Sequence, residues 1–159
     1  MSRPEIKTIQ NLEAAFAGES MAHIKYRYFA KLARAAGDEE TAKTFEETAD
    51  QEVAHAFGHL DLLYPAAQMT PAKALQIAIE GETYEYSEMY PGFRKTAIEE
   101  GNAAAAAEMA GQIAESKEHA EQFKVVLEKA AKRFAALAKV EERHANHYQK
   151  ALDQLNAKA

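Results

Sequence analysis

The stretch Ala49-Asp50-Gln51-Glu52-Val53-Ala54-His55-Ala56 places a carboxylate and an imidazole three residues apart. In an α-helix, residues at that spacing lie on the same face. The alanines and glutamine of the stretch favour a helix, so Glu52 and His55 are expected to project together from it. On its own, such a pair on a charged helix is more often a solvated surface pair than a metal site.

Three other parts of the chain carry matching groups. Glu141-Glu142-Arg143-His144 repeats the Glu-x-x-His spacing, and Glu82 and Glu85 are also three apart. Glu19 lies among small and apolar residues, where a buried charge is costly without a metal or a partner. A di-iron carboxylate bundle takes one glutamate from each of two helices and Glu-x-x-His from the other two. Carboxylate and imidazole ligands suit iron or manganese better than calcium or a soft metal, so the joint pattern predicts such a site.

Apolar residues recur at spacings of three and four along the chain, as in Ile9, Leu12 and Phe16, which predicts an all-α fold. Gly37-Asp38, Thr70-Pro71 and Gly101-Asn102 carry the residue types that end and begin helices. Helices are therefore expected over residues 5–36, 38–64, 71–100, 103–129 and 131–156. Together they predict a helical bundle.

Two residues interrupt this helical pattern. Pro91 lies inside the third expected helix and should kink it or leave one carbonyl group unpaired. Gly111 is a weaker break after residue 103, and an extended hairpin could turn there.

Composition narrows the class of protein further. The chain of 159 residues is 47% hydrophobic and 28% charged, which predicts one globular domain over 1–159. Its net charge is -6, without a basic stripe, so nucleic acid is not expected as a partner. The absence of cysteine excludes disulfides, thiolate zinc sites and cysteine-bound iron–sulfur clusters. No signal peptide and no apolar run of membrane-spanning length are found, so we expect a cytoplasmic protein without membrane contact.

Three stretches resemble the rubrerythrin family over nearly the whole chain. They are Phe16-Ala17-Gly18-Glu19-Ser20, the stretch 49–56, and Gly81-Glu82-Thr83-Tyr84-Glu85-Tyr86-Ser87-Glu88-Met89-Tyr90-Pro91, which is the most specific. The resemblance implies a ferritin-like four-helix bundle whose two iron ions reduce hydrogen peroxide to water in defence against oxidative stress. It implies the following iron ligands: Glu19, Glu52, His55, Glu82 and Glu85. It also implies that Tyr26 and Tyr90 hydrogen-bond the ligand carboxylates, although ordinary core packing explains both tyrosines equally well.

The missing cysteines separate this chain from family members that carry a rubredoxin domain. The resemblance is therefore to the shorter members, whose electrons come from an external donor such as a rubredoxin-like protein. The ligand types also accept manganese or zinc in place of iron.

The last helix offers two alternatives for closing the site. Glu115 follows Glu82 by 33 residues, as Glu52 follows Glu19, and His119 lies four residues further on. The spacing of four is expected to need a local adjustment such as a π-bulge. Glu141 and His144 keep the spacing of three but need about 25 extra residues after the third helix, in an extended hairpin, a fifth helix or a partner chain. The residues leave both alternatives open.

The connection between the second and third expected helices is short. A crossover along the bundle must span about 40 Å, whereas the residues from Tyr64 to Thr70 reach at most about 20–25 Å. A domain-swapped homodimer, in which two chains share each bundle, is one arrangement that satisfies this limit.

Two alternative functions use the same features. A ferroxidase or iron-storage protein would use the same ligands, and its negative charge would attract ferrous ion. A non-catalytic helical interaction protein would carry all of these charged pairs on its surface.

Overall fold

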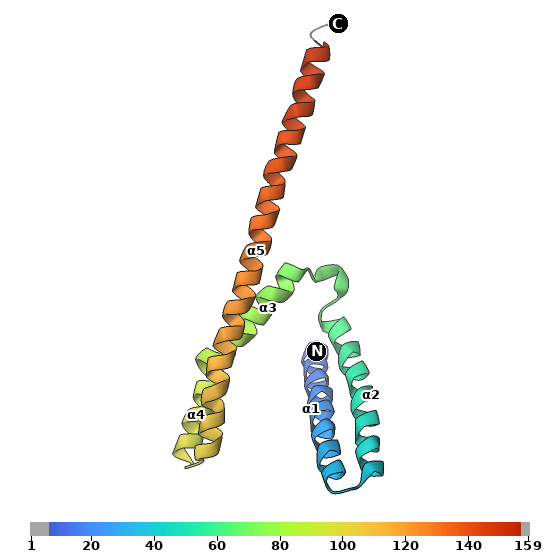
Figure 1. Ribbon diagram of the computed structural model, residues 1–159, viewed down its shortest axis with the longest axis vertical. Coiled ribbons are helices and arrows are strands. Elements are labelled where there is room, and N and C mark those ends of the chain that lie inside the picture. Colours follow the sequence, from blue (N-terminus) through green and yellow to red (C-terminus); the bar gives the residue numbers. More distant parts are fainter. Residues whose placement is uncertain (1–6, 157–159) are drawn as a thin grey trace, which may run out of the picture. The chain divides into compact units, whose positions relative to one another are not determined.

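The computed structural model describes residues 7–156, and their secondary structure is helical with no strand. In chain order the elements are α1 (Thr8–Ala35), α2 (Glu39–Leu63), the 3₁₀ turn η1 (Ala66–Gln68), α3 (Pro71–Tyr84), the π-helical segment η2 (Glu85–Met89), α4 (Tyr90–Glu99) and α5 (Ala103–Asn156) (Figure 1). The chain divides into two compact units, Met1–Met69 and Thr70–Ala159. The all-α prediction is confirmed.

The first unit is a hairpin of α1 and α2 that turns at the predicted Gly37-Asp38 signal. Gly37 has a φ of 83°, the left-handed conformation that favours glycine, and its N–H donates to the carbonyl of Arg34 at 3.0 Å. The Asp38 carboxylate accepts a hydrogen bond from the backbone N–H of Thr41 at 3.0 Å and so caps α2. That hydrogen bond lowers the pKa of Asp38.

The two helices of the hairpin meet along small side chains. Ala30, Ala42 and Ala49 are at most 1% exposed, which lets the backbones approach closely. Arg34 near the end of α1 reaches across to α2 and pairs with Glu39 at 3.0 Å and with Glu46 at 2.8 Å. Small side chains, ion pairs and the packing of Phe29 on Phe45 therefore hold the hairpin, and none of its described large side chains is fully buried.

We expect Gly37→Ala to lower the free energy of unfolding by about 1 kcal/mol, because a Cβ atom disfavours the left-handed conformation. No heavy atom lies within 4 Å of the added Cβ, so the effect comes from the backbone alone. Gly58, inside α2, is the matched control, since alanine there should raise stability by about 0.5–1 kcal/mol. Urea unfolding of both variants measures the difference, and equal effects would contradict this account of the turn.

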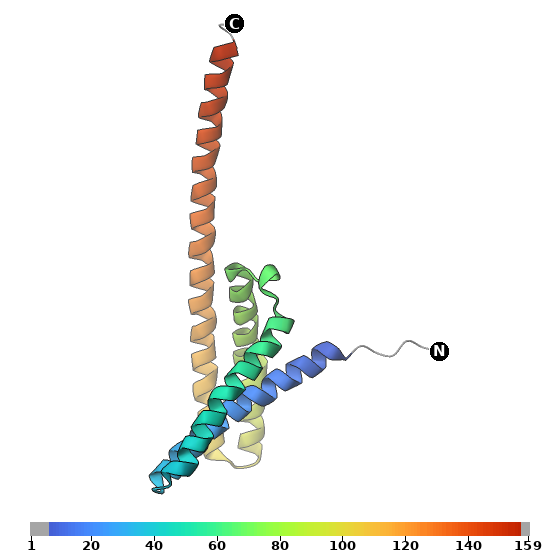
Figure 2. The same cartoon turned by 90° about the vertical axis from the view of Figure 1, so that its right-hand side faces the viewer.

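The second unit packs α3, η2 and α4 against the first half of α5 (Figures 1 and 2). Thr70 caps α3 by accepting from the N–H of Lys73 at 3.2 Å, and Pro71 is the first helical residue, as predicted. Gly101 has a φ of 72° and ends α4, and the Asn102 side chain then accepts from the N–H of Ala105 at 3.1 Å to begin α5. The boundary signals at 70–71 and 101–102 are confirmed.

Pro91 acts through the turn that precedes it. The expected helix 71–100 contains the five π-helical residues Glu85–Met89, and the N–H of Tyr90 donates to the carbonyl of Glu85. Pro91 then occupies the first turn of α4, where its missing N–H costs least. The predicted interruption is therefore a π-helical turn, a feature often found at functional sites.

The predicted break between 103–129 and 131–156 is wrong, because α5 runs without interruption over 54 residues. Gly111 lies inside this helix and is not among the glycines with a positive φ, so the expected hairpin tip is wrong as well. One glycine in an alanine-rich helix costs only about 1 kcal/mol and does not stop it. The additional C-terminal helix is thus a continuation of the last one.

Both units leave large apolar side chains uncovered. Among the described residues the buried apolar side chains are alanines, whereas Ile24 is 65% and Phe57 61% exposed on the first unit. Phe93 and Ile98 are more than half exposed on the second unit. A layer of paired helices needs a second layer to bury such a face. No helix in the described part of the chain is both long enough and apolar enough to cross a membrane.

Candidate metal centre

The first unit brings Glu19, Glu52 and His55 together. Glu19 comes from the middle of α1 and the other two from α2, and one ligand atom of each lies within 4.8 Å of the others. His55 Nδ1 is 2.9 Å from Glu52 Oε2 and 4.0 Å from Glu19 Oε2. Two carboxylates converging on an imidazole repel each other unless a cation lies between them. This donor set suits iron, manganese or zinc.

The second unit gathers a matching group of acids and one histidine. Glu82 on α3 has Oε1 3.4 Å from Nδ1 of His119 on α5. Glu85, at the start of η2, accepts a hydrogen bond of 2.9 Å from the hydroxyl of Ser116 on α5. Each unit therefore presents carboxylates and a histidine from paired helical segments.

One oxygen atom of this second group lacks a protein partner. Oε2 of Glu82 is buried, and it is the one buried side-chain polar atom in the described residues without a hydrogen bond. A buried carboxylate oxygen without a donor is costly, and a bound cation would satisfy it. The residues present therefore fit a metal ion.

The two candidate pairs for the last helix lie far apart along α5. His119 contacts Glu82, and Glu115 lies one turn before it on an exposed part of the helix. Glu141 and His144 contact each other at 3.7 Å and are 75% and 58% exposed. The expected π-bulge near Glu115 is wrong, because α5 is a regular α-helix there and residues four apart already share a face.

The two tyrosines occupy different surroundings. The ring of Tyr26 packs on Phe45, with centroids 5.7 Å apart. The pKa of Tyr90 is raised, first by burial and then by the negative charges of Glu85, Glu82 and Glu108. The Tyr90 hydroxyl therefore stays protonated at neutral pH and can donate a hydrogen bond towards the neighbouring carboxylates.

Sequence reasoning assigned no role to Ser116 or His23. Ser116 is 3% exposed, and it occupies the position three before His119 where a Glu-x-x-His motif would carry the acid. A serine in place of the expected glutamate was the feature of the sequence that could have pointed to Ser116. His23 lies four residues after Glu19, and its Nδ1 donates to the carbonyl of Ala49 at 2.8 Å, which ties α1 to α2 beside the cluster.

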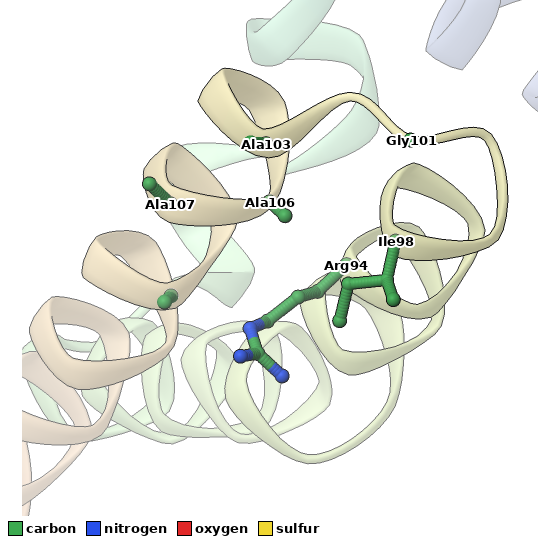
Figure 3. Close-up of a pocket in the computed structure, with 7 residues that line it drawn as sticks. Arg94, Ile98, Gly101, Ala103, Ala106 and Ala107 are labelled. Carbon is green, nitrogen blue, oxygen red and sulfur yellow. The ribbon is translucent and has the colours of Figure 1, made fainter.

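Of two hollows on the surface, one lies beside the first cluster of ligands and the other lies away from both clusters. One of about 270 Å³ lies on the α1–α2 hairpin beside Glu52, with Phe16, His23 and Phe57 in its wall. Another of about 400 Å³ lies where α4 meets the start of α5, bordered by Arg94, Ile98 and the alanines of α5 (Figure 3). The second hollow has no acid or histidine in its wall, so it is not a metal site.

The all-helical fold, with carboxylates and histidines on paired helices, has the features of the ferritin-like di-iron carboxylate class. A sequence profile of the rubrerythrin family matches residues 10–70 and 62–127, which is most of the chain. The chain therefore belongs to the rubrerythrin family.

Individual relatives agree with this assignment. The chain is 40% identical over 106 residues to a rubrerythrin of Porphyromonas gingivalis, covering 60% of this chain and 53% of that protein. It is 41% identical over 114 residues to nigerythrin of Nitratidesulfovibrio vulgaris, covering 62% and 54%. Rubrerythrin-1 of Clostridium acetobutylicum is 33% identical over 136 residues, covering 76% and 70%. The chain thus spans just over half the length of the first two relatives.

A solved structure of nigerythrin in its fully reduced, all-ferrous state is 33% identical to this chain. The match covers 82% of this chain and 70% of the nigerythrin chain, with a TM-score of 0.41.

Proposed function

We propose that this protein is a non-haem di-iron peroxidase that reduces hydrogen peroxide to water in defence against oxidative stress. The unpartnered, buried Oε2 of Glu82 is the observation that carries the proposal, together with the convergence of Glu19, Glu52 and His55. Glu85 would add a further carboxylate to the set that holds two iron ions. Manganese or zinc could substitute, because the donor atoms are the same.

We assign the last ligands to Glu115 and His119 rather than to Glu141 and His144. His119 Nδ1 lies 3.4 Å from Glu82, whereas the contact recorded for His144 is with Glu141 on its own helix. Because Glu115 precedes His119 by four residues on a regular helix, its carboxylate can approach the same ions.

The two units would act as one ferritin-like domain. Each unit has an uncovered apolar face and half of the ligands, so a bundle that joins them would bury the faces and complete the site. A homodimer in which the first unit of one chain joins the second unit of another satisfies the short connection through η1 (Ala66–Gln68).

Reduction of one hydrogen peroxide to two waters takes two electrons and two protons, and two ferrous ions would supply the electrons. The carboxylates would hold the cations and balance their charge. Tyr90, neutral at physiological pH, would orient a carboxylate by donating a hydrogen bond from its hydroxyl group. The hollow beside Glu52 gives a small oxidant room to enter. Re-reduction would use a donor such as a rubredoxin-like protein.

Stopped-flow mixing of anaerobic, ferrous-loaded protein with hydrogen peroxide or with dioxygen tests this function. We expect oxidation by peroxide to be at least several-fold faster than oxidation by dioxygen at equal concentration. Oxidation no faster with peroxide would reject the peroxidase in favour of a ferroxidase, and binding of many iron ions per chain would indicate storage. Protein that takes up no transition metal would favour the non-catalytic interaction protein.

A further inference from the structure

The second half of α5 carries an apolar stripe that no other element of its unit covers. From Ala131 onwards every residue whose exposure is described is exposed except the half-buried Val140. Phe134 is 72%, Leu137 57% and Tyr148 71% exposed. In Figures 1 and 2 this half of α5 extends beyond α3 and α4, the elements that pack on its first half.

The stripe has the spacing of a coiled-coil seam. It continues the face that buries Ser116 and Ala120 against the rest of the unit. Its members recur at alternating spacings of three and four. They are Leu127, Ala130, Phe134, Leu137, Glu141, His144 and Tyr148. Lys132, Lys139, Asn146 and Asp153 occupy the opposite face of the helix. A long exposed helix with such a stripe gains most of its stability by packing the stripe on a partner.

A polar pair interrupts the stripe near its centre. Glu141 and His144 occupy consecutive seam positions, and Glu141 Oε2 lies 3.7 Å from His144 Nδ1. Charged groups at seam positions weaken association unless the partner chain supplies matching groups. The pair therefore restricts which partner and which orientation the seam accepts.

A second copy of the same segment in antiparallel orientation supplies those groups. In the register that places Glu141 opposite the partner's His144, each glutamate faces a histidine, and Leu137 lies opposite the partner's Tyr148. A parallel pair would instead place Glu141 against Glu141.

The length of the uncovered segment agrees with this register. Its centre lies close to Glu141 and His144, so pairing about that centre covers residues 131–154 on both chains, about 36 Å of helix. Many of the flanking positions are alanines, so pairing along this seam would bury little apolar surface. A cation bound by the central groups would offset that weakness.

We propose that two chains pair antiparallel through residues 131–154 of α5 and bind a divalent transition-metal ion between Glu141 and His144 of each chain. Two carboxylates and two imidazoles form a four-coordinate set suited to Zn²⁺. This site is separate from the di-iron ligands and is incomplete without the second copy.

Cross-linking tests this pairing cleanly because the chain has no native cysteine. Ala138→Cys and Ala145→Cys place thiols at positions that face each other only in the antiparallel pair. The two variants are mixed in equal amounts and treated with a short bismaleimide, in Zn²⁺ or in chelator. We expect cross-linked heterodimer in the mixture, several-fold more with Zn²⁺, and little cross-linking of either variant alone.

Matched histidine variants show whether the metal site is responsible. His144→Ala in both chains should remove the zinc-dependent increase, whereas His147→Ala, outside the seam, should retain it. Glu52→Gln should leave the cross-link unchanged, which separates this site from the di-iron centre. Absence of heterodimer in Zn²⁺, cross-linking of Ala138→Cys alone, or an unchanged zinc effect in His144→Ala would overturn the proposal.

Discussion

Glu52→Gln is expected to abolish tight iron binding, because it removes the least exposed carboxylate of the first cluster. Its side chain is 14% exposed and contacts His55 at 2.9 Å. Loss of a residue that merely supports a metal ligand lowers affinity by about 10–100-fold, and loss of a ligand should cost at least the upper end of that range. Titration of the protein with ferrous ion under nitrogen, followed by metal analysis after desalting, measures the loss.

Glu47→Gln is the matched control for this change. Glu47 lies on the same helix, is 64% exposed and pairs with Lys43 at 3.7 Å. The substitution therefore removes the same charge as Glu52→Gln but leaves the cluster unchanged. Glu82→Gln should reproduce the Glu52→Gln loss from the second unit, because the proposed centre takes ligands from both units. Retention of both irons in either ligand variant would contradict this shared centre.

His119→Ala is expected to weaken iron binding by about 100-fold as well, whereas His144→Ala should leave it within error of the unchanged protein. The reason is the contact of His119 with Glu82 across α3 and α5, which His144 lacks. Ferrous titration of the two alanine variants side by side measures both affinities. Circular dichroism compares the helicity of each variant with that of the unchanged protein. The opposite order, with iron lost only in His144→Ala, would assign the last ligands to Glu141 and His144.

Local signals in the sequence predicted most helix boundaries correctly. Gly37 and Gly101 have the positive φ that a helix end of this kind uses, and Thr70 caps α3 through its side chain. These features depend on residues close together in the chain, so the sequence alone is sufficient to locate them.

The continuous α5 and the π-helical turn could not be predicted in the same way. Gly111 looked like a break, but the alanines around it favour helix and no capping residue accompanies it. The π-helical turn at Glu85–Met89 depends on how Pro91 and the packing against α5 shift the hydrogen-bond register. Such a balance is set by tertiary contacts rather than by local preference.

Sequence spacing could predict contacts within one helix of the candidate site, but not contacts between helices. Spacing along one helix places Glu52 beside His55, and the structure confirms that contact. Spacing cannot show that Ser116 would hydrogen-bond Glu85, or that His119 would reach Glu82 from another helix. Contacts between distant segments require the fold, and the contact of His119 with Glu82 is the observation that supports the proposed choice of His119 over His144.

An anomalous-difference map at the iron edge, from crystals of the iron-loaded protein, tests the shared di-iron centre most directly. We predict two peaks about 4 Å apart, bordered by Glu19 and Glu52 from one unit and by Glu82 and Glu85 from another, with His119 as a ligand. A peak confined to the α1–α2 hairpin, or none near Glu82, would contradict the account.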